Sequence, residues 1–423
     1  MSDYLINLHE AIYSLSDALD LVGVTHIHHG KRVAYMAAEC GKHLCWNKTQ
    51  LDELFQAAIL HDSGVSKTAV HAKLAQLQWE EESEHCHLGA ALMSSSPMLQ
   101  RFAPIVRHHH THWHELKSMD LPLEVKLNAN CIYMVDRVDI LTLKYLVNDT
   151  DILLGKESIR QTIADRRDEW FCPELVDAFM EISYSEAFWF SLEANNINGY
   201  VSTWLSETHA QRMSFEELRS LVSVFSRIVD AKSAFTREHS DGVANLSRHL
   251  GELFGLAETN CEMLELAGLL HDIGKLRIPD ELLEKPGRLT EAEIGLMRRH
   301  SFDTYNILKN ITGLEQVSLW AAHHHERVDG SGYPYHLDKD GLSLEARIIE
   351  VADVFQALAQ RRPYREPLPP EQILVILKEQ VAKGKLDADV VGKVDLDLHA
   401  CWQAAIRKGE VQMAPVLQGV SAD

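Results

Sequence analysis

The chain contains two copies of one ordered series of histidine and aspartate residues, and this repeat restricts the fold more than any other feature. The spacing between matching residues stays nearly constant, at 210 to 217 residues, from the first pair to the last. With 24 histidines in the chain, chance could align one pair, but it is a poor explanation for the whole series. A duplicated domain explains it better. The matching features are Thr49 with Thr259, His29 with His239, His61-Asp62 with His271-Asp272, His85 with His300, His109-His110 with His324-His325, and Asp136 with Asp353.

Most segments have the apolar spacing of amphipathic helices, and the alternation typical of strands is scarce. Capping-box patterns predict helix starts at Thr259 and Thr290, and a similar helix that begins at Thr49 should end at the first His-Asp pair. We therefore expect an all-α fold made of two tandem helical bundles related by internal duplication.

The length of 423 residues also favours two domains over one. A polar stretch that includes Asn195, Asn196 and Gly199 is the clearest break near the middle of the chain. We place the first domain at residues 1–195, a linker at 196–212 and the second domain at 213–423.

Charge and cysteine content narrow the functional classes. The formal charge of -21 argues against a protein that binds duplex nucleic acid, which needs a basic face. It does not exclude a small anionic substrate, because a bound metal reverses the local field. The seven cysteines form no CxxC pair, so we expect a cytoplasmic protein. The acidic first 21 residues and the lack of long apolar runs predict neither a signal peptide nor membrane association. The oligomeric state stays open.

The second copy supplies more candidate metal ligands than one tetrahedral zinc ion uses. Imidazole with carboxylate suits iron, manganese, zinc or nickel. The set is about right for two divalent ions that share Asp272, which is central in the series. Such a pair, roughly 3.5–4 Å apart, promotes phosphoester hydrolysis by polarising phosphate oxygens and activating water. The seven candidates are His239, His271, Asp272, His300, His324, His325 and Asp353.

Two further features flank these ligands. Lys275 lies one helical turn after Asp272, where its amine can hold a phosphate oxygen or the leaving group. Gly330, Gly332 and Pro334 follow the histidine pair, and this position predicts a turn that lines the substrate pocket. His323 extends the histidine run but has no separate place in the repeat.

The second half, from about 212 to about 406, resembles an HD-GYP domain, a subgroup of the HD phosphohydrolase superfamily. The resemblance lies in HDIGK at 271–275, KPG at 285–287, HHERVDGSGYP at 324–334, EARIIEVADVF at 345–355 and RPYR at 362–365. It implies an HD-type bundle that cleaves cyclic dinucleotides with a binuclear, sometimes trinuclear, iron or manganese centre; nickel and zinc are alternatives. It implies metal roles for the seven ligands and catalytic roles for Asp272 and Lys275. It implies substrate contacts for Lys275, Arg327, Gly332, Tyr333, Pro334, Arg362 and Arg365.

One departure from that family limits the number of metals. Members with a third metal carry glutamate four residues before the first histidine ligand, and Phe235 stands there in this chain. Glu238 is adjacent to His239 and points elsewhere on a helix. We therefore expect two metals in this half. Thr304 also replaces a glycine often found four residues after the third histidine.

The first half resembles the wider HD superfamily and carries a second candidate metal site. It lacks two features of the other copy, because Val65 stands in place of Lys275 and no GYP turn follows the histidine pair. We expect a regulatory or structural domain rather than a second catalytic one. Its candidate ligands are His29, His61, Asp62, His85, His109, His110 and Asp136.

An HD-like domain ahead of an HD-GYP domain is similar to the 3′3′-cGAMP phosphodiesterases of vibrios. The resemblance predicts hydrolysis of 3′3′-cGAMP to linear 5′-pApG. The alternatives are hydrolysis of cyclic di-GMP to 5′-pGpG, a cyclic-dinucleotide receptor without turnover, and a nucleotide or RNA phosphohydrolase. No residue in the sequence distinguishes adenine from guanine recognition.

Overall fold

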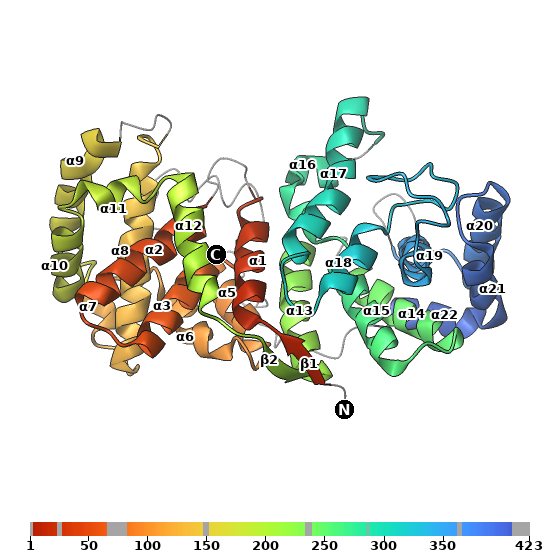
Figure 1. Cartoon of the computed structure of the whole chain (residues 1–423), viewed down its shortest axis with the longest axis horizontal. Coiled ribbons are helices and arrows are strands. Elements are labelled where there is room, and N and C mark those ends of the chain that lie inside the picture. Colours follow the sequence, from red (N-terminus) through yellow and green to blue (C-terminus); the bar gives the residue numbers. More distant parts are fainter. Residues whose placement is uncertain are drawn as a thin grey trace, which may run out of the picture.

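The computed structural model describes residues 3–22, 28–65, 83–146, 152–232, 239–285, 287–361 and 366–407. Within these ranges the chain forms helices and one small two-stranded sheet. Figure 1 shows two helical bundles side by side, with the sheet at their junction. The predicted all-α fold of two tandem helical bundles is confirmed.

The first bundle begins with strand β1 and helix α1, and its remaining helices surround the first histidine series. The elements are β1 (Asp3–Ile6), α1 (Leu8–Leu19), α2 (His29–His43), α3 (Lys48–Leu60), α5 (Ser83–Ser94), η1 (Gln100–Phe102), α6 (Ala103–His108), α7 (Trp113–Leu116), α8 (Leu123–Thr142), α9 (Ile152–Ala164), α10 (Pro173–Ile182), α11 (Glu186–Phe190) and α12 (Ala194–Ser206).

The second bundle repeats this order, with a strand and a helix ahead of the ligand-bearing helices. The elements are β2 (Gln211–Ser214), α13 (Phe215–Asp230), α14 (His239–Leu253), α15 (Glu258–Leu270), η2 (Ile273–Arg277), α16 (Asp280–Leu283), α17 (Glu291–Leu308), α18 (Glu315–Ala322), α19 (Leu344–Ala359), α20 (Pro370–Ala382), α21 (Ala388–Leu396) and α22 (Leu398–Ile406). Helices α14 and α15 begin 210 residues after α2 and α3, so the spacing of the sequence repeat is also the spacing of the helices.

The predicted helix starts are right in one of three cases. Thr290 caps α17 in a capping box with Glu293, as the sequence predicted. Helix α3 instead begins at Lys48, because Asn47, two residues before the predicted cap, accepts a hydrogen bond from the backbone N–H of Gln50 through its side-chain oxygen. The predicted box at Thr259 is wrong, since α15 begins at Glu258. The Glu262 carboxylate that would complete that box accepts the hydroxyl of Tyr4 from the other half.

The two halves meet through equivalent elements. Strand β1 pairs antiparallel with β2, which occupies the same place in the second copy, and Asp3 lies opposite Ser214. Helix α1 packs on α17, and its counterpart α13 packs on α5. One continuous cluster of buried hydrophobic residues includes members of both halves. The junction is therefore an internal version of a twofold interface, in which the same surfaces are used by both partners.

The residues predicted to link the domains pack against the first bundle. They include most of α12, in which the Trp204 ring lies 4.2 Å from that of Phe55 and the Tyr200 ring 4.9 Å from that of Tyr35, centroid to centroid. Aromatic contacts of this kind stabilise a fixed position of the helix. The proposed domain bounds, 1–195 and 213–423, stay predictions.

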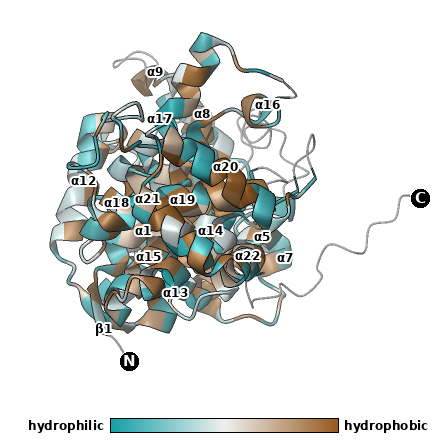
Figure 2. Cartoon of the chain, turned by 90° about the vertical axis from the view of Figure 1, so that its right-hand side faces the viewer, coloured by the Kyte–Doolittle hydropathy of each residue, from teal (hydrophilic) through white to brown (hydrophobic). Residues whose placement is uncertain are grey.

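The helices are amphipathic, as their sequence spacing requires. Helix α20 shows both hydrophobic and hydrophilic residues on the face in Figure 2, and it buries Ile373, Leu374 and Leu377. Among the described residues, every helix falls short of the length and apolar character that crossing a bilayer requires.

Two candidate metal centres

The seven candidate ligands of the second half converge from the ends and faces of five helices. His239 is the first residue of α14, and the chain turns at His271 and Asp272, between α15 and η2. His300 lies in α17, His324 and His325 follow α18, and Asp353 lies in α19. Six of the seven are buried residues, and His325 is partly exposed. The structure thus brings together residues that are up to 114 positions apart in the sequence.

Asp272 lies at the middle of this group. Its Oδ2 is 3.3 Å from Nε2 of His271 and 3.7 Å from Nε2 of His239. Its Oδ1 is 3.6 Å from Nε2 of His300 and 3.8 Å from Nε2 of His324. The two oxygens therefore face different imidazole pairs, which is the arrangement that a carboxylate shared by two ions requires.

The remaining ligands extend the two groups. Asp353 Oδ1 lies 3.2 Å from Nε2 of His239, and Asp353 Oδ2 lies 3.9 Å from Nδ1 of His325. The rings of His325 and His300 are 5.0 Å apart between centroids. Asp353 thus lies near one imidazole of each group.

The residues present fit divalent cations. Asp272 Oδ1 is buried and has no hydrogen-bond partner, which is costly unless a cation neutralises the oxygen. His271 and His324 each donate from Nδ1 to a backbone carbonyl, at 2.7 and 2.6 Å, so that Nε2 carries its lone pair toward the centre. Burial also lowers the pKa of His300 to about 4, which keeps this imidazole in the neutral form that binds metals.

Lys275 reaches the same carboxylate. Its Nζ lies 2.5 Å from Asp272 Oδ2, and its side chain is 21% exposed, so the amine borders both the centre and the space outside it. Burial alone would raise the pKa of Asp272, but His271 and Lys275 outweigh burial and hold it well below its ordinary value. The carboxylate is therefore ionised at neutral pH.

The GYP turn is fixed to the histidine pair by a buried glutamate. Glu326 accepts hydrogen bonds from the backbone N–H groups of Tyr335 and Leu337, at 2.7 and 3.0 Å. This folds the loop back so that the Tyr333 ring lies 4.9 Å from that of His325, centroid to centroid. The following residue, Pro334, is joined through a cis peptide bond.

Two other residues of the predicted pocket pack beneath the turn. Gly332 approaches the backbone of Glu326 so closely that a methyl group there would overlap it. The guanidinium of Arg327 lies 2.6 Å from the carboxylate of Glu350 in α19, and this ion pair ties the loop to that helix. The guanidinium of Arg298, which the sequence did not single out, lies 5.4 Å from the centre of the Tyr333 ring.

Three predicted positions lie outside the described residues: Arg362, Arg365 and Phe235. The expectation of two rather than three metals, which rests on Phe235, therefore stays a prediction. His323 is described, and its ring lies 5.4 Å from that of Tyr335.

The first half reproduces the same arrangement around Asp62. Its Oδ2 lies 3.4 Å from Nε2 of both His29 and His61, and its Oδ1 lies 3.6 Å from Nε2 of His85 and 3.8 Å from Nε2 of His109. Nε2 of His61 is buried without a hydrogen-bond partner, and burial lowers the pKa of this imidazole to about 4.

The other two predicted ligands complete this first-half group. Asp136 Oδ1 lies 3.3 Å from Nε2 of His29, and the His110 ring lies 4.3 Å from that of His109 between centroids. All seven candidates of the first half are thus gathered around one carboxylate, as they are in the second half.

The two centres differ in the residues around them. In the first half, the guanidinium of Arg137 lies 2.6 Å from Asp136 Oδ2. In the second half, the corresponding oxygen, Asp353 Oδ2, faces His325 instead. His112 occupies the position that matches Arg327, and its ring stacks on that of Trp170 with 4.4 Å between the centroids. Val65 is buried at the position that matches Lys275. The first half therefore has no lysine at the position that matches Lys275, and its sequence has no GYP turn after the histidine pair.

Sequence reasoning missed residues that contact the ligands from outside the repeat. His239 Nδ1 lies 2.5 Å from Gln356 Oε1, and its counterpart His29 Nδ1 lies 2.7 Å from Asp139 Oδ2. Both partners lie three residues after the last aspartate ligand, which is one helical turn, and this spacing could have identified them.

Cys86 was also missed, although it directly follows His85. Burial opposes ionisation of Cys86, but His109 and His85 lower the pKa of its thiol to about 6.

Comparisons with known proteins agree with this duplicated geometry. Two family models, each described as an HD domain, match residues 27–141 and 223–390. The chain is 35% identical over 416 residues to the 3′3′-cGAMP-specific phosphodiesterase 1 of Vibrio cholerae, covering 97% of this chain and 96% of that protein. It is 37% identical to a cyclic di-GMP phosphodiesterase response regulator of Xanthomonas campestris, over 44% of this chain and 51% of that protein.

A solved structure shows the same fold over nearly the whole chain. It is a cyclic GMP-AMP specific phosphodiesterase from Vibrio cholerae, with a TM-score of 0.63 and 24% identity, and the match covers 95% of this chain and 98% of that one. The paired ligand series, the fold and the full-length match agree. The chain belongs to the HD-domain family of cyclic-dinucleotide phosphodiesterases.

Proposed function

We propose that this protein is a metal-dependent phosphodiesterase that opens the ring of 3′3′-cGAMP and releases linear 5′-pApG. The observation that carries the proposal is the position of Asp272, whose two oxygens face separate imidazole pairs while Lys275 reaches the same carboxylate. The match to a 3′3′-cGAMP-specific phosphodiesterase over 97% of the chain supports the choice of substrate. Cyclic di-GMP is the second candidate, because a relative named for it matches 44% of the chain.

The proposed cofactors are two divalent ions, with iron or manganese preferred and nickel or zinc as alternatives. When bound, the ions supply Lewis-acid polarisation of the phosphate and activation of water at neutral pH. The residues that would hold them form two groups that share Asp272: His239, His271 and Asp353 in one, and His300, His324 and His325 in the other.

The protein side chains bind and orient the phosphodiester. The Lys275 amine, which is partly exposed beside Asp272, donates to a non-bridging phosphate oxygen and offsets the negative charge that grows there during the reaction. Tyr333 and Pro334 limit access to His325, and Arg327 holds the turn through Glu350. Arg362 and Arg365 are proposed to contact substrate phosphates or bases on the strength of the resemblance alone.

The first half serves as a regulatory or structural domain in this proposal. It retains the seven ligand types but has Val65 in place of the lysine. Without that amine, nothing at this position offsets charge on a bound phosphate. Catalysis is therefore assigned to the second half.

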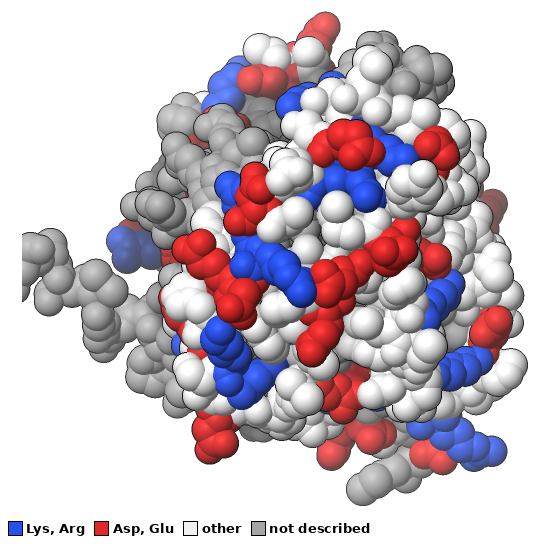
Figure 3. All heavy atoms as spheres, turned by 90° about the vertical axis from the view of Figure 1, so that its left-hand side faces the viewer, with Lys and Arg blue, Asp and Glu red and all other residues white. Residues whose placement is uncertain are grey.

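A small anionic substrate also suits the surface. Figure 3 shows acidic and basic side chains interspersed over the face of the first half, and the coloured residues there form no continuous basic patch. This supports a cyclic dinucleotide rather than duplex nucleic acid as the partner. No disulfide bond joins any of the seven cysteines, all of which lie in the described residues, and this supports a cytoplasmic location.

The test uses the full chain loaded with Mn²⁺ or Fe²⁺ and offered 3′3′-cGAMP, cyclic di-GMP and linear nucleotides, with products identified by mass spectrometry. We expect 5′-pApG to form with a higher kcat/KM than 5′-pGpG. A preference for cyclic di-GMP would establish the second candidate instead. Binding without turnover would make the protein a receptor, and turnover of linear nucleotides alone would exclude ring opening.

The duplication offers a matched pair of variants that locates the catalysis. Asp272→Asn and Asp62→Asn make the same change at equivalent positions in the two centres. We expect Asp272→Asn to abolish turnover and Asp62→Asn to retain it. The opposite result would move catalysis to the first half, and loss in both variants would give the first half a catalytic or coupling role.

A further inference from the structure

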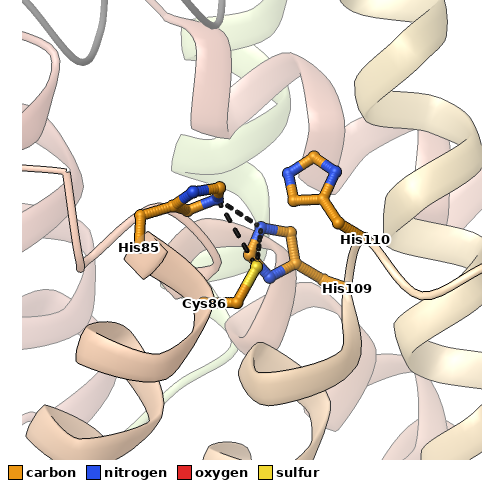
Figure 4. Close-up of side chains that lie close together, drawn as sticks. All are labelled: His85, Cys86, His109 and His110. Atoms are coloured by element: carbon orange, nitrogen blue, oxygen red, sulfur yellow. Dashed lines mark hydrogen bonds between the residues drawn. The ribbon is translucent and has the colours of Figure 1, made fainter. Parts of the chain in front are cut away.

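The first centre contains a sulfur atom that the second centre lacks. His85 and Cys86 lie in α5, and His109 and His110 follow α6. In Figure 4 the sulfur of Cys86 and a ring nitrogen from each of His85 and His109 point toward one another, with His110 beside them. One ligand atom from each of the four residues lies within 4.8 Å of the other three. The thiol therefore belongs to the same cluster as the imidazoles.

The distances within this cluster match those around a single ion. A tetrahedral zinc ion with bonds of about 2.05 Å to nitrogen and about 2.3 Å to sulfur separates two nitrogens by about 3.3 Å, and sulfur from nitrogen by about 3.6 Å. Here Nε2 of His85 and Nε2 of His109 are 3.3 Å apart. Cys86 Sγ is 3.7 Å from the first and 4.0 Å from the second. Little rearrangement is needed for the three atoms to bind one ion.

The ligand atoms are also prepared for metal binding. His109 donates from Nδ1 to the carbonyl oxygen of Val106 at 2.6 Å, which leaves the lone pair of Nε2 directed into the cluster. His85, Cys86 and His109 are only 5%, 2% and 0% exposed, so water does not compete freely for them. Asp62 Oδ1 faces the same nitrogens. A divalent ion together with one thiolate and one carboxylate is electrically neutral, which removes the cost of a buried net charge.

The second half provides an internal comparison. Ser301 occupies the position that corresponds to Cys86, 215 residues later, and its Oγ lies 3.4 Å from Nε2 of His300. At this position the two centres therefore differ in one atom, which is sulfur in the first half and oxygen in the second. Thiolate ligands favour zinc, whereas imidazole and carboxylate accept iron and manganese.

We propose that Cys86 is a thiolate ligand, together with His85, His109 and His110, to a zinc ion in the first half. The two halves then bind different metals, a thiolate-bound zinc in the first half and iron or manganese in the second. Because the sulfur completes the ligand set of a closed four-coordinate site, this ion is structural. The proposal is independent of the substrate that the second half hydrolyses.

The test uses Co²⁺ as a spectroscopic probe, because a thiolate bound to Co²⁺ gives a near-ultraviolet charge-transfer band that imidazole and carboxylate do not. The metal-free full chain is titrated with Co²⁺. We expect the band in the wild type and in Cys45→Ser, which removes an exposed thiol of the same half, and its loss in Cys86→Ser. A band that persists in Cys86→Ser, or that never appears in the wild type, overturns the proposal.

A second measurement needs no variant, so a folding defect in Cys86→Ser cannot obscure the result. Zinc-edge X-ray absorption of the wild type, loaded with Zn²⁺ until every zinc-binding site is filled, should show a sulfur neighbour at about 2.3 Å. A shell of nitrogen and oxygen alone overturns the proposal. The double variant Cys86→Ser/Ser301→Cys places the thiol in the second centre instead of the first. Titration of this variant with Co²⁺ should restore the charge-transfer band.

Discussion

The two centres have the same repeated ligand residues, but they differ at position 275, where the second half has a lysine and the first half has Val65. Both centres place an aspartate between imidazole pairs, but Asp272 has a lysine amine 2.5 Å away, whereas the buried Val65 stands at the position that matches this lysine. In the phosphate complex that we propose, the amine contributes to the transition state more than to metal binding.

Lys275→Met should therefore lower kcat by about 10²- to 10³-fold, as loss of a group that stabilises developing negative charge does. The metal content should stay unchanged, because methionine fills the same space and removes no ligand. The measurement is steady-state kinetics with metal analysis of the same samples. Lys309→Met, in an exposed position at the end of α17, is the control and should behave as the wild type. Equal activity of both variants would remove Lys275 from the mechanism.

Gln356 holds the His239 ring at 2.5 Å from outside the ligand set. Gln356→Ala should weaken metal binding to the second half about 10- to 100-fold, because such contacts fix the orientation of a ligating imidazole. Chelator competition measures the affinity, and Gln372→Ala, an exposed glutamine on α20, serves as the control. An unchanged affinity would show that packing alone orients His239.

At the scale of elements, the centres depend on close backbone contacts between neighbouring helices. Gly274 in η2 lies so near α17 that a methyl group there would overlap the carbonyl oxygen of His300, and Gly64 has the same relation to His85. Each glycine lets the turn after the His-Asp pair approach the helix that carries the third histidine. This contact sets the distance between the two imidazole groups.

Gly274→Ala should destabilise the protein by about 1–3 kcal/mol, the usual cost of forcing extra volume into a packed site, and should lower its metal content. Gly295→Ala is the control in α17 itself, where an added methyl meets no atom within 4 Å. That change should stabilise the protein by up to about 1 kcal/mol, because alanine is the better helix former. Thermal unfolding compares the two variants, and a stabilised Gly274→Ala would contradict the contact.

At the scale of the whole molecule, each half supplies a strand and a helix to the junction, so the halves support each other. The Tyr4 hydroxyl donates to the buried carboxylate of Glu262, which joins β1 to α15. Helix α1 also reaches the second half, where Glu10 accepts the N–H of Thr312 at 2.7 Å. A disturbance in the first two elements is therefore transmitted to the second half.

Tyr4→Phe should lower the free energy of unfolding by about 1–3 kcal/mol, because it leaves the Glu262 carboxylate without its donor. Tyr184→Phe, at a position 74% exposed, is the matched control and should have little effect. Thermal or chemical denaturation of the full chain measures both. Equal stability of the two variants would mean that water replaces the tyrosine hydroxyl.

The junction also makes stability depend on pH. Asp20 lines a pocket of about 210 Å³ between the halves, together with Arg277 and Asp303. Burial raises the pKa of Asp20 to about 6, despite the nearby Lys31. A carboxyl whose pKa is higher in the folded state stabilises the fold at low pH, and this contribution is lost as pH rises through about 6.

Asp20→Asn should remove this dependence. Relative to the wild type it should become more stable as pH rises from about 4 to about 6, and the gain should stay at up to about 3 kcal/mol above that range. Melting temperatures of both proteins at several pH values, with equal metal concentrations, give the comparison. A difference that does not change with pH would place Asp20 in a solvated position.

The sequence alone determined the fold class, the duplication and the seven repeated candidate ligands of each centre. The order of the ligand residues and the helical spacing of the apolar residues are properties of the sequence, so they can be recognised without a structure. For the same reason, the loss of lysine at Val65 was visible as a difference between two copies.

Tertiary structure decided how these residues are used. The capping box predicted at Thr259 does not form, since α15 begins at Glu258, and the carboxylate of Glu262 instead accepts the hydroxyl of Tyr4, more than 250 residues away. The division of the Asp272 oxygens between two imidazole pairs and the direction of the Cys86 sulfur depend on how helices pack. Such contacts join residues that are distant in sequence, and their geometry is fixed by the shape of the packed core rather than by spacing along the chain.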